Sequence, residues 1–220
     1  MIELRKWLRA GFLAPEGAEP QKKSKLIEKE TLPSVIKVIY ETKGFWDSLV
    51  QQTDEIAFEN IEIPNIGQNL EPGEPSLPQE GLYVAIPEGA TVTDIKVVAT
   101  KQKTFAIDQP VKPAPTPTTD KSAPPEFIPK KEIYEKNVTF PGELYKNLGP
   151  KEMGDVTVLH LMMYPVQYNP VANTVILYKK IELDVSYKSA ERRLRGAPTR
   201  KSRKRVPAGY EDQILNFENI

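Results

Sequence analysis

The chain of 220 residues contains no cysteine and only one histidine, His160. Without cysteine it can form no disulfide, no thiolate metal site and no cysteine nucleophile. Zinc sites and acid–base triads normally use several histidines, so the chain offers few groups for a catalytic or metal centre. His160 lies in an apolar run and is expected to be a core residue. We predict a non-catalytic chain without metal or other cofactor.

Long apolar runs are also missing. Near the N-terminus, Trp7 and Phe12 are separated by the charged Arg9, and no uninterrupted segment has the length of a signal peptide or a transmembrane helix. We therefore expect a chain that is soluble as written, has no membrane partner and shows no signal peptide within this sequence.

The formal net charge is zero, but the charges are unevenly distributed. Residues 188–205 contain nine basic residues and one acidic residue, a local balance of +8, so the remainder carries −8. The segment has three interpretations: a contact to phosphate backbones, a protease-sensitive connection, or a contact to an acidic partner. It has no interleaved aromatics for stacking on bases, which argues against nucleic acid as a partner. We favour a connection processed at its arginines, with Arg195, Arg200, Arg203 and Arg205 as candidates.

Twenty-one prolines and many short β-branched runs predict strands separated by turns. Strands are expected at 34–40, 58–63, 82–86, 91–99 and 156–164, and a long one ends at Lys188. In that last strand Ile181, Leu183 and Val185 alternate with polar residues, which is typical of a half-buried antiparallel strand. The predicted fold class is all-β, an antiparallel β-sandwich or jelly-roll barrel with irregular termini. The expected organisation is an irregular extension at 1–33, a body at 34–188 and a basic tether with a junction at 189–220.

Two turns and one long loop complete the pattern. Gly89 is expected to supply a positive φ, and Asn169-Pro170 is expected to start a turn between two strands. Residues 108–131 contain seven prolines and little apolar content. A loop of this length is usually functional or disordered, and its proline-rich centre favours an extended path.

Several short motifs occur together in a characteristic order. They are Gly-Glu-Pro-Ser-Leu-Pro at 73–78, Ile-Pro-Glu-Gly-Ala at 86–90, Tyr134, Phe-Pro-Gly at 140–142, Tyr-Pro-Val-Gln-Tyr-Asn-Pro at 164–170 and the ending at 210–219. In this order and spacing they resemble the N-terminal propeptide of gingipain-type cysteine peptidases. The resemblance covers roughly residues 34–220.

The resemblance implies a jelly-roll sandwich that covers the active site of a cysteine peptidase catalytic domain, in cis or in trans. Such a propeptide keeps the zymogen latent, assists its folding and is removed by proteolysis, in an extracellular or cell-surface setting. The alternative is a stand-alone β-sandwich binding module of a secreted or surface protein. Nucleic-acid binding through the basic segment is a distant third hypothesis.

In the family a surface loop presents a basic side chain to the specificity pocket of the enzyme. The corresponding stretch here is 108–131. Lys121 is the basic residue nearest to the expected position, with Thr119 and Asp120 beside it, and the loop contains no arginine. A lysine-directed enzyme, a less selective enzyme and a loop that merely blocks access are all compatible with this departure.

Overall fold

The computed structural model describes residues 34–119, 124–188, 206–207, 209–210 and 213–217, together with the backbone of residues 7–9. In chain order its elements are β1 (Trp7–Arg9), β2 (Val35–Glu41), β3 (Phe45–Gln51), β4 (Ala57–Glu62), β5 (Gly67–Gln68), β6 (Pro78–Ala85), β7 (Thr91–Ala106), α1 (Lys131–Tyr134), β8 (Tyr145–Met153), β9 (Val156–Met163), β10 (Val166–Asn169) and β11 (Thr174–Lys188). No helix in this part of the chain is long and apolar enough to cross a membrane.

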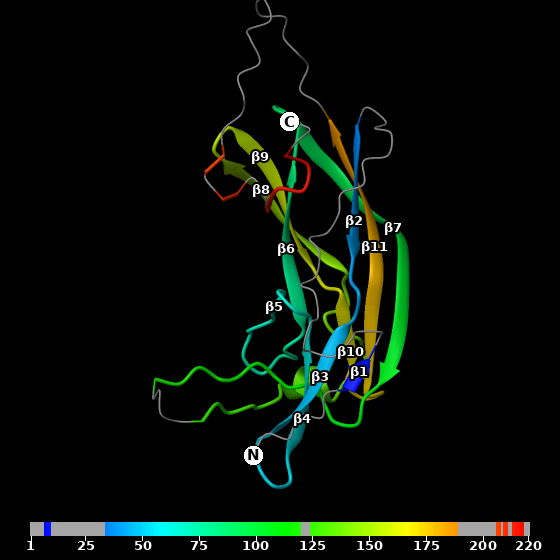
Figure 1. Cartoon of the computed structure of the whole chain (residues 1–220), viewed down its shortest axis with the longest axis vertical. Helices are drawn as coiled ribbons and strands as arrows, with labels where there is room; N and C mark the ends of the chain where they lie inside the picture. Colours follow the sequence, from blue (N-terminus) through cyan, green and yellow to red (C-terminus); the bar gives the residue numbers. More distant parts are fainter. Residues whose placement is uncertain are drawn as a thin grey trace, which may run out of the picture.

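The long strand β11 organises the first sheet (Figure 1). β10 and then β2 pair antiparallel with successive parts of β11, while β7 pairs with almost its whole length along the opposite edge. The alternation read from the sequence is confirmed, because Ile181, Leu183 and Val185 are fully buried and the residues between them are only partly covered. β7 extends to Ala106, seven residues beyond the predicted end.

A second antiparallel sheet, in the order β5-β6-β9-β8, faces the first. The buried side chains between the two sheets come from β2 and β11 on one side and from β6 and β9 on the other, and they include Tyr40, Val84, Leu161 and Leu183. A further cluster lies around β10 and the lower part of β11, where Phe45, Tyr168 and Leu177 meet. The predicted all-β antiparallel sandwich is confirmed.

The third sheet has the order β1-β3-β4, and of its strands the sequence predicts only β4, through the run at 58–63. Trp7–Arg9 was expected to be irregular but forms β1, with Trp7 opposite Asp47 of β3. β3 itself was not predicted, because Phe45-Trp-Asp-Ser-Leu-Val-Gln51 has no clean alternation of polar and apolar residues. Pairing with β4 on its other side stabilises it as a strand.

The predicted turns are present. Gly89 has φ 72°, and Asn173 has φ 48° in the turn that follows Asn169-Pro170. The side-chain oxygen of Asn169 accepts the Ala172 N–H at 3.0 Å, which is the usual way in which asparagine stabilises a turn. β9 is buried on most positions of both faces, as expected for the run at 156–164.

Candidate functional site

The proline-rich loop at 108–131 projects from the sandwich (Figure 1). Its outgoing arm adds to the neighbouring backbone like a short strand. The Glu59 N–H donates to Pro110 O at 2.8 Å, and the Lys112 N–H donates to Glu59 O at 2.7 Å. Further out, the Ala114 N–H donates to Glu74 O at 2.8 Å. The arm is therefore built into the fold.

The returning arm is fixed by the same motif that carried the family resemblance. Gly73 donates its N–H to Ala114 O and accepts the Lys130 N–H, each at 2.9 Å. Gly73 has φ 78°, and a Cβ placed there would lie 2.9 Å from Ile128 O. Only glycine combines this backbone conformation with so close an approach of another chain segment. Gly73 thus holds both arms of the loop together.

Side chains reinforce this anchorage. Lys130 Nζ lies 3.2 Å from Glu74 Oε1 and 3.6 Å from Glu71 Oε1. Lys112 Nζ lies 5.7 Å from the ring centre of Phe127, close enough for a cation–π contact, and burial lowers the pKa of Lys112. Both lysines are thereby engaged in the base of the loop.

The first part of the loop, expected to be either functional or disordered, is ordered and belongs to the core. Val111 and Ala114 are fully buried, and the hydroxyl of Tyr134 donates to Val111 O at 2.8 Å. Burial raises the pKa of Tyr134 well above its ordinary value and that of Tyr168, whose ring meets Tyr134 edge-on, to about 12. Both phenols stay protonated at any physiological pH.

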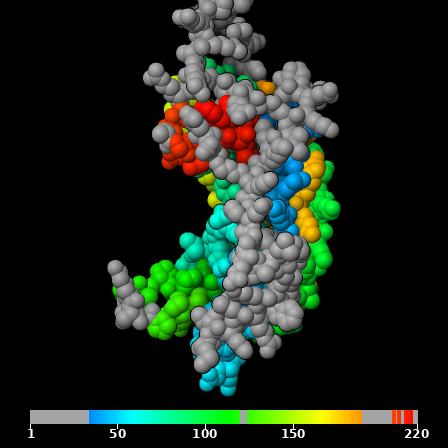
Figure 2. Space-filling model, in the orientation of Figure 1, coloured from blue at the N-terminus to red at the C-terminus, as the bar shows by residue number. Residues whose placement is uncertain are grey.

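Beyond the Thr116 N–H, which donates to Glu126 O at 3.1 Å, the loop extends away from the body. Figure 2 shows this arm in green as a projection, and the surface is hollowed between it and the C-terminal segment above. Thr119, the last described residue of the outgoing arm, is exposed. The predicted contact residues Asp120 and Lys121 lie outside the described residues, and so do Arg195, Arg200, Arg203 and Arg205.

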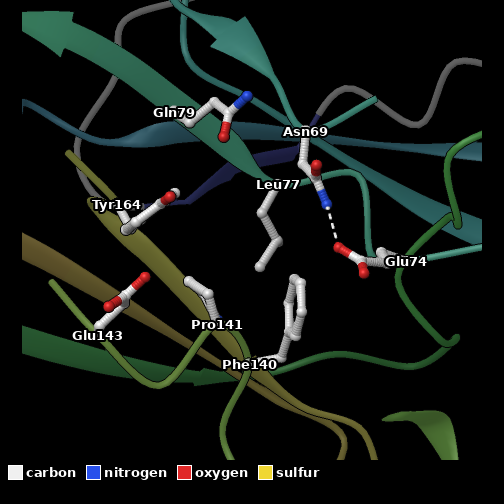
Figure 3. A pocket seen from close by; sticks show the side chains of 8 residues that line it. All are labelled: Asn69, Glu74, Leu77, Gln79, Phe140, Pro141, Glu143 and Tyr164. Carbon is white, nitrogen blue, oxygen red and sulfur yellow. Dashed lines mark hydrogen bonds between the residues drawn. The ribbon is translucent and has the colours of Figure 1, made fainter. Parts of the chain in front are cut away.

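Three of the sequence motifs meet around one pocket of about 250 Å³ at the base of the loop (Figure 3). It is lined by Asn69, Glu74, Leu77, Gln79, Phe140, Pro141, Glu143 and Tyr164. Phe140 and Tyr168 exchange backbone hydrogen bonds of 2.8 and 2.9 Å, and Glu143 O accepts from the Gln167 side chain at 2.8 Å. These bonds fix the motifs at 140–142 and 164–170 to each other, and Leu77 of the third motif packs in the same core cluster as Phe140 and Tyr168. The pocket wall offers carboxylates and amides but no nucleophile paired with a base.

His160 is buried in β9 and stacks on Tyr83 of β6, with 4.6 Å between ring centres. Its Nδ1 has no hydrogen-bond partner among the described residues. Burial and then the nearby Lys151 lower its pKa, which favours the neutral ring. The described residues contain no group of three or more histidine, aspartate or glutamate side chains that could hold a metal ion. His160 therefore acts as a core residue, as the sequence predicted.

The profile of the Propeptide_C25 family matches residues 16–220. The chain belongs to the Propeptide_C25 family. The match extends over the projecting loop, the three motifs at its base and the C-terminal segment, and it confirms both the resemblance and the prediction of a non-catalytic propeptide segment.

This C25 propeptide is similar in sequence to Lys-gingipain of Porphyromonas gingivalis, with 29% identity over 140 residues. That alignment covers 61% of the propeptide and 8% of the relative, so the propeptide matches a small part of a much longer protein. Lys-gingipain 381, from the same species, matches to the same extent.

Two solved structures share the fold of this C25 propeptide. One is a complex of the P. gingivalis RgpB pro- and mature domains, with a TM-score of 0.68 and 23% identity, covering 92% of the propeptide and all of that chain. The other, from a study of zymogenic latency of gingipain K, has a TM-score of 0.57 and 24% identity, covering 71% and 88% of the two chains. At these identities the likeness establishes the fold.

Proposed function

We propose that this propeptide is an intramolecular inhibitor and folding assistant of a gingipain-like cysteine peptidase. The observation that carries the proposal is the anchored projection at 108–131. Both of its arms are hydrogen-bonded to the sandwich or to each other, so the tip extends outward from a fixed base. A segment held in its binding conformation loses little conformational entropy on binding, which suits a loop that lies in a substrate cleft.

Lys121 is proposed as the residue that enters the specificity pocket of the enzyme, flanked by Thr119 and Asp120. The loop at 108–131 contains four lysines and no arginine. Lys112 and Lys130 make contacts at the base of the loop, and Lys131 is the first residue of α1, which follows the loop. Lys121 is therefore the lysine that we propose for contact with the enzyme. The name of the relatives, Lys-gingipain, supports a lysine-directed pocket as the target.

The proposed partner is the catalytic domain of the peptidase, and the proposed setting is extracellular or at the cell surface. The pro- and mature-domain complex of RgpB supports such a partner. The hollow beside the loop in Figure 2 gives that domain a concave face to rest on. The match to a propeptide profile over 16–220 does not favour the alternative of a stand-alone binding module. The basic segment with Arg195, Arg200, Arg203 and Arg205 is proposed as the processing tether.

An inhibition assay tests the loop. The chain is titrated against the mature catalytic domain of Lys-gingipain with a lysyl peptide substrate. We expect tight inhibition, a loss of at least about tenfold in affinity for Lys121→Ala, and no loss for Lys101→Ala, an exposed lysine on β7. Shortening the loop between Thr116 and Glu126 should abolish inhibition. Unchanged inhibition after that shortening would overturn the proposed role of the loop. Unchanged inhibition by Lys121→Ala alone would contradict the proposed role of Lys121 and leave the role of the loop intact.

Folding assistance is measured separately. The unfolded catalytic domain is diluted into buffer with and without the propeptide. The yield of active enzyme is measured after the propeptide has been removed by proteolysis. A higher yield with the propeptide is expected. Equal yields would contradict the assistant role and leave the inhibitor role intact.

A further inference from the structure

Beyond Gln79, one edge of β6 is covered by no other strand among the residues that the structure describes. β9 pairs with one edge of β6 from Glu80 to Ala85, whereas β5 reaches only Pro78 and Gln79 on the other. The carbonyl of Tyr83 and both backbone polar groups of Ala85 point toward this second edge. A buried strand edge with unpaired polar groups is costly, so some partner must satisfy them.

The C-terminal residues supply that partner. Ile214 forms a parallel bridge with Tyr83, and the Leu215 N–H donates to Tyr83 O at 2.9 Å. Asn216 then binds both polar groups of Ala85: its Oδ1 accepts the Ala85 N–H at 2.7 Å, and its Nδ2 donates to Ala85 O at 3.0 Å. The side-chain amide of Asn216 thus replaces the peptide group of a neighbouring strand.

Apolar contacts accompany these hydrogen bonds. Ile214 is 4% exposed and packs with Ala85, Val156 and Val158 in a cluster of its own. Val206 and Phe217, at the two ends of the C-terminal segment, pack against the same cluster. In Figure 1 the segment, drawn in red, lies against the upper ends of β6, β8 and β9. Val206, Ile214, Leu215, Asn216 and Phe217 therefore pack or hydrogen-bond onto the sandwich.

We infer that the C-terminal segment, through Val206 and residues 213–217, forms a non-covalent clamp, which keeps the two parts of the chain together after proteolysis between Lys188 and Val206. Strand addition to a sheet edge is a general mode of peptide binding, in which backbone hydrogen bonds give affinity and side-chain pockets give specificity. The clamp is independent of the tether because its hydrogen bonds and its contacts with Ala85, Val156 and Val158 join Val206 and residues 213–217 to the sandwich and involve no residue of 189–205. Cleavage of the chain after any of the eight basic residues at 189–205 therefore breaks none of the clamp contacts.

Under the proposed function, on which this step rests, a cut in the tether would not release whatever follows Ile220. A peptidase domain attached there would stay bound to its inhibitor through the clamp and would be freed only when the clamp leaves β6. The tether and the clamp would then be two separate controls on activation.

The test uses the full chain with a site for a sequence-specific protease placed between Arg195 and Arg200. After complete cleavage, size-exclusion chromatography in 0.5 M NaCl and native mass spectrometry measure whether the C-terminal fragment stays with the body. The salt screens attraction between the basic fragment and the acidic body. We expect the unsubstituted fragment and the Tyr210→Ala fragment to remain bound, since Tyr210 is 41% exposed. Asn216→Ala should weaken retention at least about tenfold, because both polar groups of Ala85 lose their partner.

A competition measurement avoids any effect of Asn216→Ala on folding. A synthetic peptide of residues 206–220 is added to the cleaved, unsubstituted protein and should displace the retained fragment. The same peptide with Asn216→Ala should need at least about ten times the concentration. Dissociation of the unsubstituted fragment upon cleavage, or equal potency of the two peptides, would overturn the clamp. No peptidase is present in this experiment, so its failure is separate from failure of the inhibition assay.

Discussion

At the scale of single residues, buried Tyr40 and half-buried Glu80 show how the edge of the core tolerates a carboxylate. Tyr40 is fully buried, and its hydroxyl donates to Glu80 Oε2 at 2.8 Å. Burial raises the pKa of Glu80, while the hydrogen bond from Tyr40 acts in the opposite direction. The net shift is upward, so desolvation of the charge outweighs the hydrogen bond that supports it.

This shift predicts a pH-dependent effect of Glu80→Gln. A carboxyl group whose pKa is raised by folding contributes most to stability below its unfolded value of 4.5, and that contribution is lost as the pH rises through the folded value. Glutamine stays neutral and keeps an acceptor for Tyr40. The melting temperature of Glu80→Gln relative to the unsubstituted chain should therefore rise between pH 4.5 and pH 8. Glu132→Gln, at an exposed carboxylate, is the control. A pH-independent difference for Glu80→Gln would contradict the prediction.

At the scale of elements, the sequence predicted strands well wherever their own periodicity decided them. The alternation of Ile181, Leu183 and Val185 specified the buried face of β11 directly. β3 lacked such a signal, because a polar residue, Asp47, takes a buried position whereas the apolar Trp46 beside it is only half-buried. The sequence also gave no prediction of how the loop is anchored, because the anchorage consists mainly of backbone hydrogen bonds that any residue could make.

Gly73 differs from the other residues that anchor the loop, because its position requires glycine. This requirement can be tested. Gly149 has a similar φ of 87°, but no atom lies within 4 Å of the position that a Cβ would take there, whereas a Cβ on Gly73 would meet Ile128 O and Lys130 Cγ at 2.9 Å. Gly149→Ala should cost about 1–2 kcal/mol of unfolding free energy for the backbone conformation alone. Gly73→Ala should cost about 1–3 kcal/mol more for the clash, and should increase protease cleavage between Thr116 and Glu126.

Chemical denaturation and limited proteolysis measure the two effects of Gly73→Ala separately. Equal destabilisation by the two glycine substitutions, with unchanged cleavage of the loop, would show that Gly73 does not hold the arms together.

At the scale of the whole molecule, β11 connects two core clusters. Leu177 belongs to the cluster around Phe45 and Tyr168, and Leu183 belongs to the one between the two main sheets. Both side chains are fully buried. Because one continuous strand contributes to both clusters, we expect the body to unfold as a single cooperative unit.

Leu177→Ala and Leu183→Ala test this cooperativity. Each should lower the unfolding free energy by about 2–5 kcal/mol, and each should shift the whole transition. Leu70→Ala, at a leucine that is 74% exposed, should change stability by less than about 0.5 kcal/mol. Near-ultraviolet circular dichroism and calorimetry should give coincident transitions. Two separate transitions, with each leucine affecting only one, would show that the clusters unfold independently.

The sequence by itself determined the all-β class, the buried face of β11, the turns at Gly89 and Asn169-Pro170, and, through the order of its motifs, the family. These features depend on side-chain periodicity and on local backbone preferences, which neighbouring residues set. Only the tertiary structure decided that Gly73 joins the two arms of the loop and that Asn216 covers the edge of β6. Those contacts link segments far apart in the chain through backbone polar groups. The identity of each partner is therefore fixed by how the sheets pack and not by any local pattern.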